Sequence, residues 1–146
     1  MRIAVAADHA AFREKDALAD HLREAGHQVL DFGTRGETSV DYPDFARPAA
    51  LAVGRGECDR AVIVCGSGVG VSIVANKVKG ARAVLLANPF LAEMSRRHND
   101  ANVATFGARW QDLPTMKALL RIWLDTPFEG GRHAGRVAKI DADPCC

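Results

Sequence analysis

Five short apolar runs, each followed by a segment of helical character, constrain the fold of this chain more than any other feature. The runs are rich in Val, Ile and Ala and lie at residues 2–7, 28–32, 61–65, 83–86 and 103–106. Such alternation is typical of parallel strands joined by crossover helices. We therefore expect an α/β fold, a three-layer, doubly wound (Rossmann-like) sheet of five parallel strands. Doubly wound chains of this size commonly have the strand order 2-1-3-4-5 with right-handed crossovers, and we expect that order here.

Helix periodicity, together with capping and turn residues, places the segments between these strands. Leu18, Leu22 and Ala25 recur on one helix face, and Gly26 follows as a stop signal. Asp112 is the expected N-cap of a later helix that begins just before Pro114. The other helices are expected at residues 43–55, 72–77 and 89–98, and a C-terminal helix after the glycine pair at 130–131. Residues from about 141 to 146 are expected to form a flexible tail.

Length and charge limit the classes of protein. The 146 residues suffice for one hydrophobic core, so we expect a single domain over 1–146. The chain has 19 basic and 18 acidic residues and no run of basic residues. This balance predicts neither a nucleic-acid partner nor binding to a membrane surface. No apolar stretch reaches the length of a membrane span and no signal peptide is recognisable, so we expect a cytoplasmic protein. None of the four cysteines forms a C-x-x-C pair, and reduced thiols are expected.

The expected strand order brings two loops together. In doubly wound sheets ligands bind at the carboxyl ends of the strands where the winding reverses, here after strands 2–7 and 61–65. The first loop contains Asp8 and His9, and the second reads "CGSGVG" at 65–70. Its alternating glycines expose successive backbone N–H groups at a helix N-terminus, which suits an anion; a tight packing turn is the alternative. The spacing fits neither the dinucleotide fingerprint nor a Walker loop.

Cys65 has two interpretations. A cysteine at the end of a buried strand is often a small hydrophobic filler. Backbone donors and a helix N-terminus beside it would instead stabilise a thiolate, and so a base or nucleophile. Ser67 can donate a hydrogen bond into the same loop or simply form the turn.

Other polar residues also allow two interpretations from the sequence alone. Asp8 and His9 could contact a sugar or phosphate, or could cap the following helix. His98 and Asn99 could be functional or could end a helix. Arg132 and Arg136, four residues apart, form either an anion clamp or a solvated helix face, and the lack of acidic partners for both favours the clamp.

Six segments of the chain form one recognisable set. They are "DHAAF" (8–12), "DYPDFA" (41–46), "CGSGVGVSIVANK" (65–77), "SRRHNDANV" (95–103), "FGAR" (106–109) and "EGGRHAGRV" (129–137). Together they resemble the ribose-5-phosphate isomerase B family, within the wider group that contains the galactose-6-phosphate isomerase subunits. The resemblance runs from residue 2 to about residue 140. It implies an aldose–ketose isomerase that interconverts ribose 5-phosphate and ribulose 5-phosphate through a cis-enediolate, with no metal and no cofactor.

The resemblance also implies roles for individual residues. Cys65 is the base that moves the proton between C1 and C2, and His98 opens the sugar ring. The loop amides, with Ser67, stabilise the enediolate oxygen, whereas the glycine pattern alone suggested the phosphate there. Apolar Val71 and Val74 occupy the region where a second branch of the family has a glutamate base. The implied substrate-binding residues are Asp8, His9, Tyr42, Gly66, Gly68, Val69, Gly70, Asn99, Arg109, Arg132 and Arg136.

The implied partners are a small phosphorylated sugar and further copies of the chain. The family is homodimeric or homotetrameric, with sites shared across the interface. Two alternatives stay open. The substrate could be another aldose phosphate, such as allose 6-phosphate, galactose 6-phosphate or a tetrose phosphate. A non-catalytic flavodoxin-like module that binds a sugar phosphate or nucleotide would use the same loops, and would be indifferent to the loss of Cys65.

Overall fold

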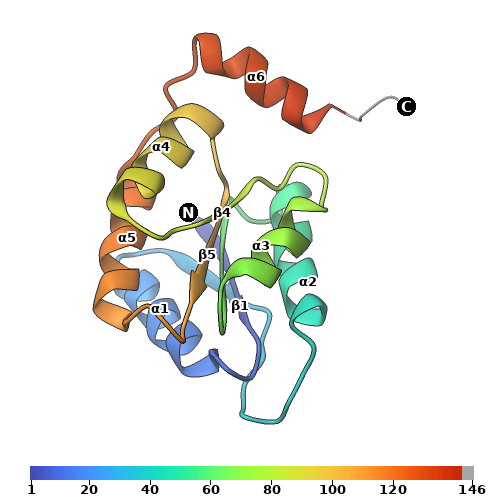
Figure 1. The fold of residues 1–146 in the computed structure, drawn as a ribbon, viewed down its shortest axis with the longest axis vertical. Helices are drawn as coiled ribbons and strands as arrows, with labels where there is room; N and C mark the ends of the chain where they lie inside the picture. Colours follow the sequence, from blue (N-terminus) through green and yellow to red (C-terminus); the bar gives the residue numbers. More distant parts are fainter. Residues whose placement is uncertain (143–146) are drawn as a thin grey trace.

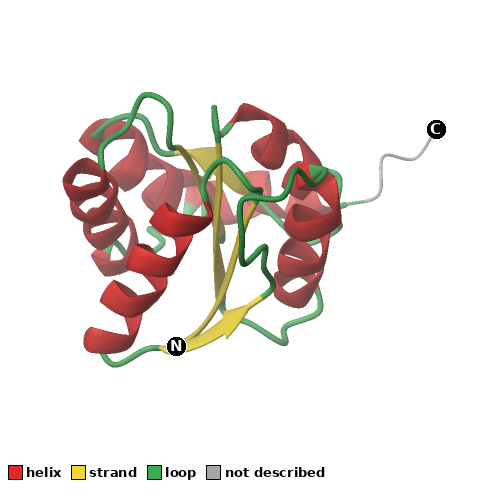
Figure 2. Ribbon diagram, turned by 90° about the horizontal axis from the view of Figure 1, so that it is seen from below, coloured by secondary structure: helices red, strands yellow, loops and turns green. Residues whose placement is uncertain are grey.

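A parallel five-stranded sheet with helices on both faces forms the body of the protein (Figures 1 and 2). The computed structural model describes residues 1–142, so residues 143–146 of the expected tail lie outside the described residues. This arrangement confirms the predicted three-layer α/β fold. The strands are β1 (Arg2–Ala7), β2 (Gln28–Asp31), β3 (Arg60–Cys65), β4 (Ala83–Leu85) and β5 (Val103–Gly107).

The predicted helices are all present. Asp112 caps its helix as expected, since its Oδ1 accepts the N–H of Thr115 at 2.8 Å. The helix after the glycines begins at Val69, three residues before the predicted Ser72, so two loop residues belong to its first turn. The helices are α1 (Phe12–Glu24), α2 (Tyr42–Gly54), α3 (Val69–Asn76), α4 (Pro89–Asn99), α5 (Leu113–Asp125) and α6 (Arg132–Asp141).

The order of the last two strands differs from the prediction. The sheet runs β2-β1-β3-β5-β4, so β5 lies between β3 and β4. All five residues of β5 are buried, and it forms ladders with strands on both sides. β4 has three residues, all half-buried, which suits a sheet edge. The prediction of 2-1-3-4-5 failed because strand length and burial decide which strand occupies the interior, while the apolar pattern of the two runs is similar.

Alternate residues of the inner strands supply two cores. Ile3 and Val5 face α1 and α5, and Ala4 and Ala6 face α2 and α3. The second core is largely alanine, with Ala49 of α2 fully buried in it. Small side chains on both surfaces let these helices lie close to the sheet.

The C-terminal helix α6 lies beyond the amino edge of the sheet, the side at which the strands begin, and contacts α4 (Figure 1). Its buried residues are His133 and Val137, one turn apart. An ion pair of 2.6 Å joins Asp141 at its end to Arg82, which also pairs with Asp100. Within residues 1–142 no helix combines the length and apolar character that crossing a membrane requires.

Candidate active site

The glycine loop, defined as residues 65–70, joins β3 to α3. Cys65 is the last residue of β3, and its side chain is 4% exposed. Its Sγ accepts the backbone N–H of Gly68 at 3.1 Å. A backbone N–H that points at sulphur stabilises a thiolate more than a thiol. The structure therefore places one backbone donor of the glycine loop on the Cys65 sulphur.

Gly68 gives this loop its shape. Its φ is 78°, in the left-handed region that favours glycine. A Cβ at this position would lie 2.5 Å from Cδ1 of Leu85 and 2.8 Å from the carbonyl carbon of Phe106. The Gly68 carbonyl in turn accepts the hydroxyl of Thr105 at 3.0 Å. The loop therefore rests directly on β5, and a side chain at Gly68 would push it away.

The first turn of α3 continues this loop. The Ser67 hydroxyl oxygen accepts the N–H of Val69 at 3.3 Å, and both side chains are exposed. Tyr42, the first residue of α2, covers Gly70: a Cβ there would lie 2.8 Å from the tyrosine ring. The tyrosine hydroxyl thus lies beside the N-terminus of α3, where backbone N–H groups have no intrahelical partner.

Asp8 and His9 follow β1 at the same edge of the sheet. Asp8 is 9% exposed, and its Oδ1 accepts the N–H of Ala10 at 3.0 Å. Ala11 is the N-cap of α1 and has no side-chain cap bond, so Asp8 closes a short turn and does not cap the helix. His9 accepts the N–H of Val40 on Nδ1 at 3.2 Å, which leaves the proton of a neutral ring on Nε2.

Arg109 completes this set from the turn after β5. Its N–H donates to the carbonyl of Gly66 at 3.0 Å. Its guanidinium lies over the same glycine, because a Cβ on Gly66 would lie 2.9 Å from Nε. We call the residues at this end of the sheet the carboxyl-edge group. They are Asp8, His9, Tyr42, Cys65, Gly66, Ser67, Gly68, Val69, Gly70 and Arg109.

The other predicted site residues lie at the opposite end of the sheet, in what we call the amino-edge group: His98, Asn99, Arg132 and Arg136. The first two end α4, which leads into the amino end of β5, and the arginines belong to the exposed start of α6 (Figure 1). β5 alone spans four residue steps of about 3.3 Å, so about 13 Å separates the two edges. One chain therefore does not bring its two groups together.

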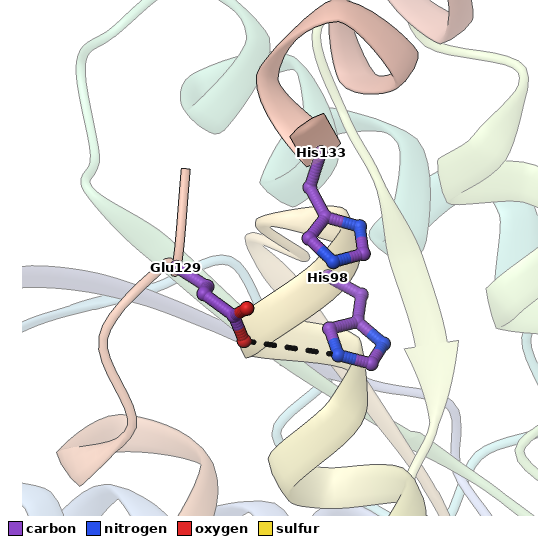
Figure 3. A group of neighbouring side chains, drawn as sticks. All are labelled: His98, Glu129 and His133. Carbon is purple, nitrogen blue, oxygen red and sulfur yellow. Dashed lines mark ion pairs between the residues drawn. The ribbon is translucent and has the colours of Figure 1, made fainter. Parts of the chain in front are cut away.

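His98 lies in a cluster with Glu129 and His133 (Figure 3). The two imidazoles stack with centroids 4.3 Å apart and planes 9° from parallel. The Nε2 of His98 lies 3.9 Å from Oε2 of Glu129. Burial, with the neighbouring His98 and Arg132, lowers the pKa of His133 below its ordinary value, so this ring favours its neutral form. The arrangement is a surface-accessible imidazole that rests on a buried neutral one.

The same three side chains offer ligand atoms within 4.8 Å of one another. A shared metal must lie in the plane of each imidazole that binds it, because the nitrogen lone pairs lie in the ring planes. The nearly parallel planes of His98 and His133 do not meet in this way. Glu129 also accepts a hydrogen bond from Arg97 at 3.1 Å. The cluster as it stands suits acid–base chemistry better than a metal, which would require one ring to turn.

Sequence reasoning assigned no role to Glu129 and His133. The signal for His133 was its one-turn spacing from Val137, which marks the buried face of α6. Arg132 donates toward Nε2 of His133 at 3.3 Å, and both Arg132 and Arg136 are exposed. Glu129 had no signal, because it lies in a loop without periodicity.

Known proteins match this chain along nearly its whole length. Residues 3–140 match the family model described as Ribose/Galactose Isomerase. The chain is 45% identical to ribose-5-phosphate isomerase B of Escherichia coli K12 over 97% of this chain and 95% of that protein. It is 39% identical to D-erythrulose-4-phosphate isomerase of Pectobacterium atrosepticum, over 96% and 93%. The structure of Clostridium thermocellum ribose-5-phosphate isomerase B superposes with a TM-score of 0.94 at 48% identity, over 97% of this chain and 95% of that chain.

Proposed function

Because this chain belongs to the ribose/galactose isomerase family, a family of sugar-phosphate isomerases, we propose that it interconverts D-ribose 5-phosphate and D-ribulose 5-phosphate. The observation that carries the proposal is the Cys65 sulphur at the end of β3, with the Gly68 N–H donating to it. Isomerisation needs a base at the carbon next to a carbonyl and donors at the carbonyl oxygen. The glycine loop contains a candidate base, Cys65, and backbone N–H donors within six consecutive residues.

The first step opens the furanose ring. His98 takes the proton of the anomeric hydroxyl, the C1–O1 carbonyl forms as the bond from C1 to the ring oxygen breaks, and the imidazolium of His98 gives its proton to that ring oxygen. The products are the free aldehyde and a hydroxyl at C4. His98 suits this step because its ring is partly exposed and lies 3.9 Å from the Glu129 carboxylate, and an imidazole can both accept and donate a proton.

The second step moves a proton from C2 to C1. The Cys65 thiolate takes the C2 proton, the C–H electrons form the C1–C2 double bond, and the carbonyl oxygen becomes the enediolate oxygen. The thiol then returns the proton to C1, while the proton on O2 passes to O1 and C2 becomes the carbonyl carbon. Loop N–H groups other than those of Gly68 and Val69, which donate to Cys65 and Ser67, stabilise the charge on the oxygen. Losing one such donor typically costs about 3–4 kcal/mol of activation free energy.

We further propose that two chains build each site, in a homodimer or homotetramer. Acid–base groups act at hydrogen-bond distance from the substrate, about 3 Å. Cys65 and His98 of one chain lie at opposite sheet edges, so a sugar at the glycine loop cannot contact both. The amino-edge group of a second subunit, with Arg132 and Arg136 for the phosphate, would complete the site. Exposed Val69 and Ile73 of α3 and Phe90 of α4 offer apolar contact area for such an assembly.

A tetrose phosphate is the second candidate substrate. The observation that favours it is the relative from Pectobacterium atrosepticum, named for D-erythrulose 4-phosphate and 39% identical over nearly the whole chain. The proposed proton transfer would be the same, because it involves only C1, C2 and their oxygens.

The deciding experiment measures ribulose 5-phosphate formation from ribose 5-phosphate in the presence of a chelator. Cys65→Ala is expected to abolish turnover. Cys58→Ala is the matched control, since Cys58 is a buried free cysteine of the same core but precedes β3, at the opposite end of that strand from the glycine loop. D-erythrulose 4-phosphate and allose 6-phosphate are assayed in parallel. Turnover of ribose 5-phosphate that survives Cys65→Ala would refute the assignment of the base, and turnover of another sugar alone would refute the substrate.

A further inference from the structure

Trp110 contacts the glycine loop but has no role in the proposed reaction. It lies in the turn after β5, and its side chain is 52% exposed. Its indole N–H donates to the carbonyl of Ser67 at 3.0 Å. An exposed tryptophan that bonds to a loop backbone restrains that backbone, because its ring is rigid and has only two side-chain torsions.

The Ser67 carbonyl belongs to the same peptide group as the Gly68 N–H. In a trans peptide the C=O and N–H point in opposite directions across a planar unit. The Trp110 indole therefore holds one end of this unit, and the other end donates to the Cys65 sulphur at 3.1 Å. Consecutive hydrogen bonds through one amide polarise one another and strengthen both. The indole is thus connected to the sulphur through a single rigid group.

Gly107 provides an independent indication that this contact is built into the fold. It pairs with Cys65 in the β3–β5 ladder. A Cβ at Gly107 would lie 2.0 Å from the Trp110 indole nitrogen and 2.5 Å from the Ser67 oxygen. The indole and the carbonyl meet in the space that the absent side chain leaves. Gln111 fixes this turn by accepting the Gly107 N–H at 2.9 Å and donating to Leu86 at 2.6 Å.

We infer that Trp110 is a positioning residue for Cys65, acting through the Ser67–Gly68 peptide to hold the Gly68 N–H on the sulphur. The catalytic consequence rests on the proposed function, in which Cys65 is the base. Arg109 lies beside Gly66 and Tyr42 beside Gly70, and Asp8 and His9 follow the end of β1, which pairs with β3; the substitution below leaves all four in place.

The test replaces the indole by a ring without the N–H, in Trp110→Phe. Alkylation of Cys65 by iodoacetamide is followed by mass spectrometry across the pH range in which thiols titrate. The plateau of the alkylation rate at high pH reports access to the sulphur. The midpoint, the pH at which the rate reaches half of this plateau, reports how well the thiolate is stabilised. We expect the midpoint to move to higher pH, and kcat/KM for ribose 5-phosphate to fall about three- to tenfold through kcat, the range that one hydrogen bond of ordinary strength gives.

Trp123→Phe is the matched control, because the Trp123 indole nitrogen is buried and makes no hydrogen bond to the described residues. It should leave the Cys65 midpoint unchanged. An unchanged midpoint in Trp110→Phe overturns the inference, even if turnover falls, since Trp110 would then act on the substrate or on another subunit. A shifted midpoint in a protein that does not isomerise ribose 5-phosphate supports the link from Trp110 to Cys65 and refutes the proposed function alone.

Discussion

Two inactive variants should restore activity to each other if each site draws its base from one subunit and its ring-opening histidine from another. Cys65→Ala removes the base, and His98→Ala removes the histidine at the opposite edge of the sheet. In a mixed dimer, one site combines the intact Cys65 of one chain with the intact His98 of the other. The second site contains both substitutions and is dead.

The expected recovery follows from counting. Random association of equal amounts gives about half mixed dimers, each with one working site out of two, so about one quarter of wild-type activity returns. If Cys65 and His98 of the same chain acted together, every site in the mixture would lack one group. The expected recovery would then be nil.

The assay co-refolds the two variants, purifies the mixed dimer through two different tags, one on each chain, applied in sequence, and follows ribulose 5-phosphate formation. Purified mixed dimers should have about half the activity of the wild type per chain, because one of the two sites is intact. A double variant, Cys65→Ala with His98→Ala, refolded with wild type is the control, since all its mixed dimers should be inactive. Mixed dimers that are shown to form but do not turn over ribose 5-phosphate would refute the shared site.

Three further predictions concern stability. Gly68→Ala should lower the free energy of unfolding by about 2–4 kcal/mol in a denaturant titration, because it combines a left-handed φ with overlap against Leu85; a loss within error would contradict the loop geometry. Lys15→Met should lower the free energy of unfolding by about 2–4 kcal/mol at neutral pH, because it leaves the Asp31 carboxylate without its cationic partner. Burial alone would raise the pKa of Asp31, but the hydrogen bonds from Lys15 and Gly33 hold that pKa low. The loss of stability should therefore shrink as acid protonates Asp31, and a loss that does not depend on pH would argue against the ion pair. Because the pKa of His133 is lowered in the fold, its contribution to stability is present above the unfolded pKa of about 6.5 and is lost as the pH falls below that value. The melting temperatures of wild type and His133→Gln should therefore converge on acidification. Plots of melting temperature against pH that stay parallel for the two proteins would refute this.

Most of the fold was predictable because local chemistry determines it. The strands and helices follow from apolar periodicity, and Asp112 and Gly26 mark a helix start and a helix end as predicted. The order of β4 and β5 was not predictable from the pattern, since both runs are short and apolar. The start of α3 was also predicted too late, because Gly70 lies inside its first turn although glycine is a weak helix former.

The candidate site also contains residues that the sequence predicts and residues that it does not. Cys65 and the glycine loop were predictable, because a strand end and alternating glycines are local signals. The position of His98 followed only once α4 was seen to end at the amino edge of the sheet. Trp110 carried no sequence signal, since its contact with Ser67 links two segments 43 residues apart. Interactions between distant segments depend on the packed fold and leave no periodic trace in the sequence.

The position of α6 has a consequence for how such a protein diverges. The proposed base ends a strand that is buried from its second residue onward, whereas the arginines proposed for the phosphate belong to a helix that lies outside the sheet and buries only His133 and Val137. Substitutions on the exposed side of α6 can therefore accumulate without disturbing the core. On the proposed function, gene duplicates could drift toward shorter or longer sugars by altering this helix while they inherit the proton-transfer chemistry unchanged.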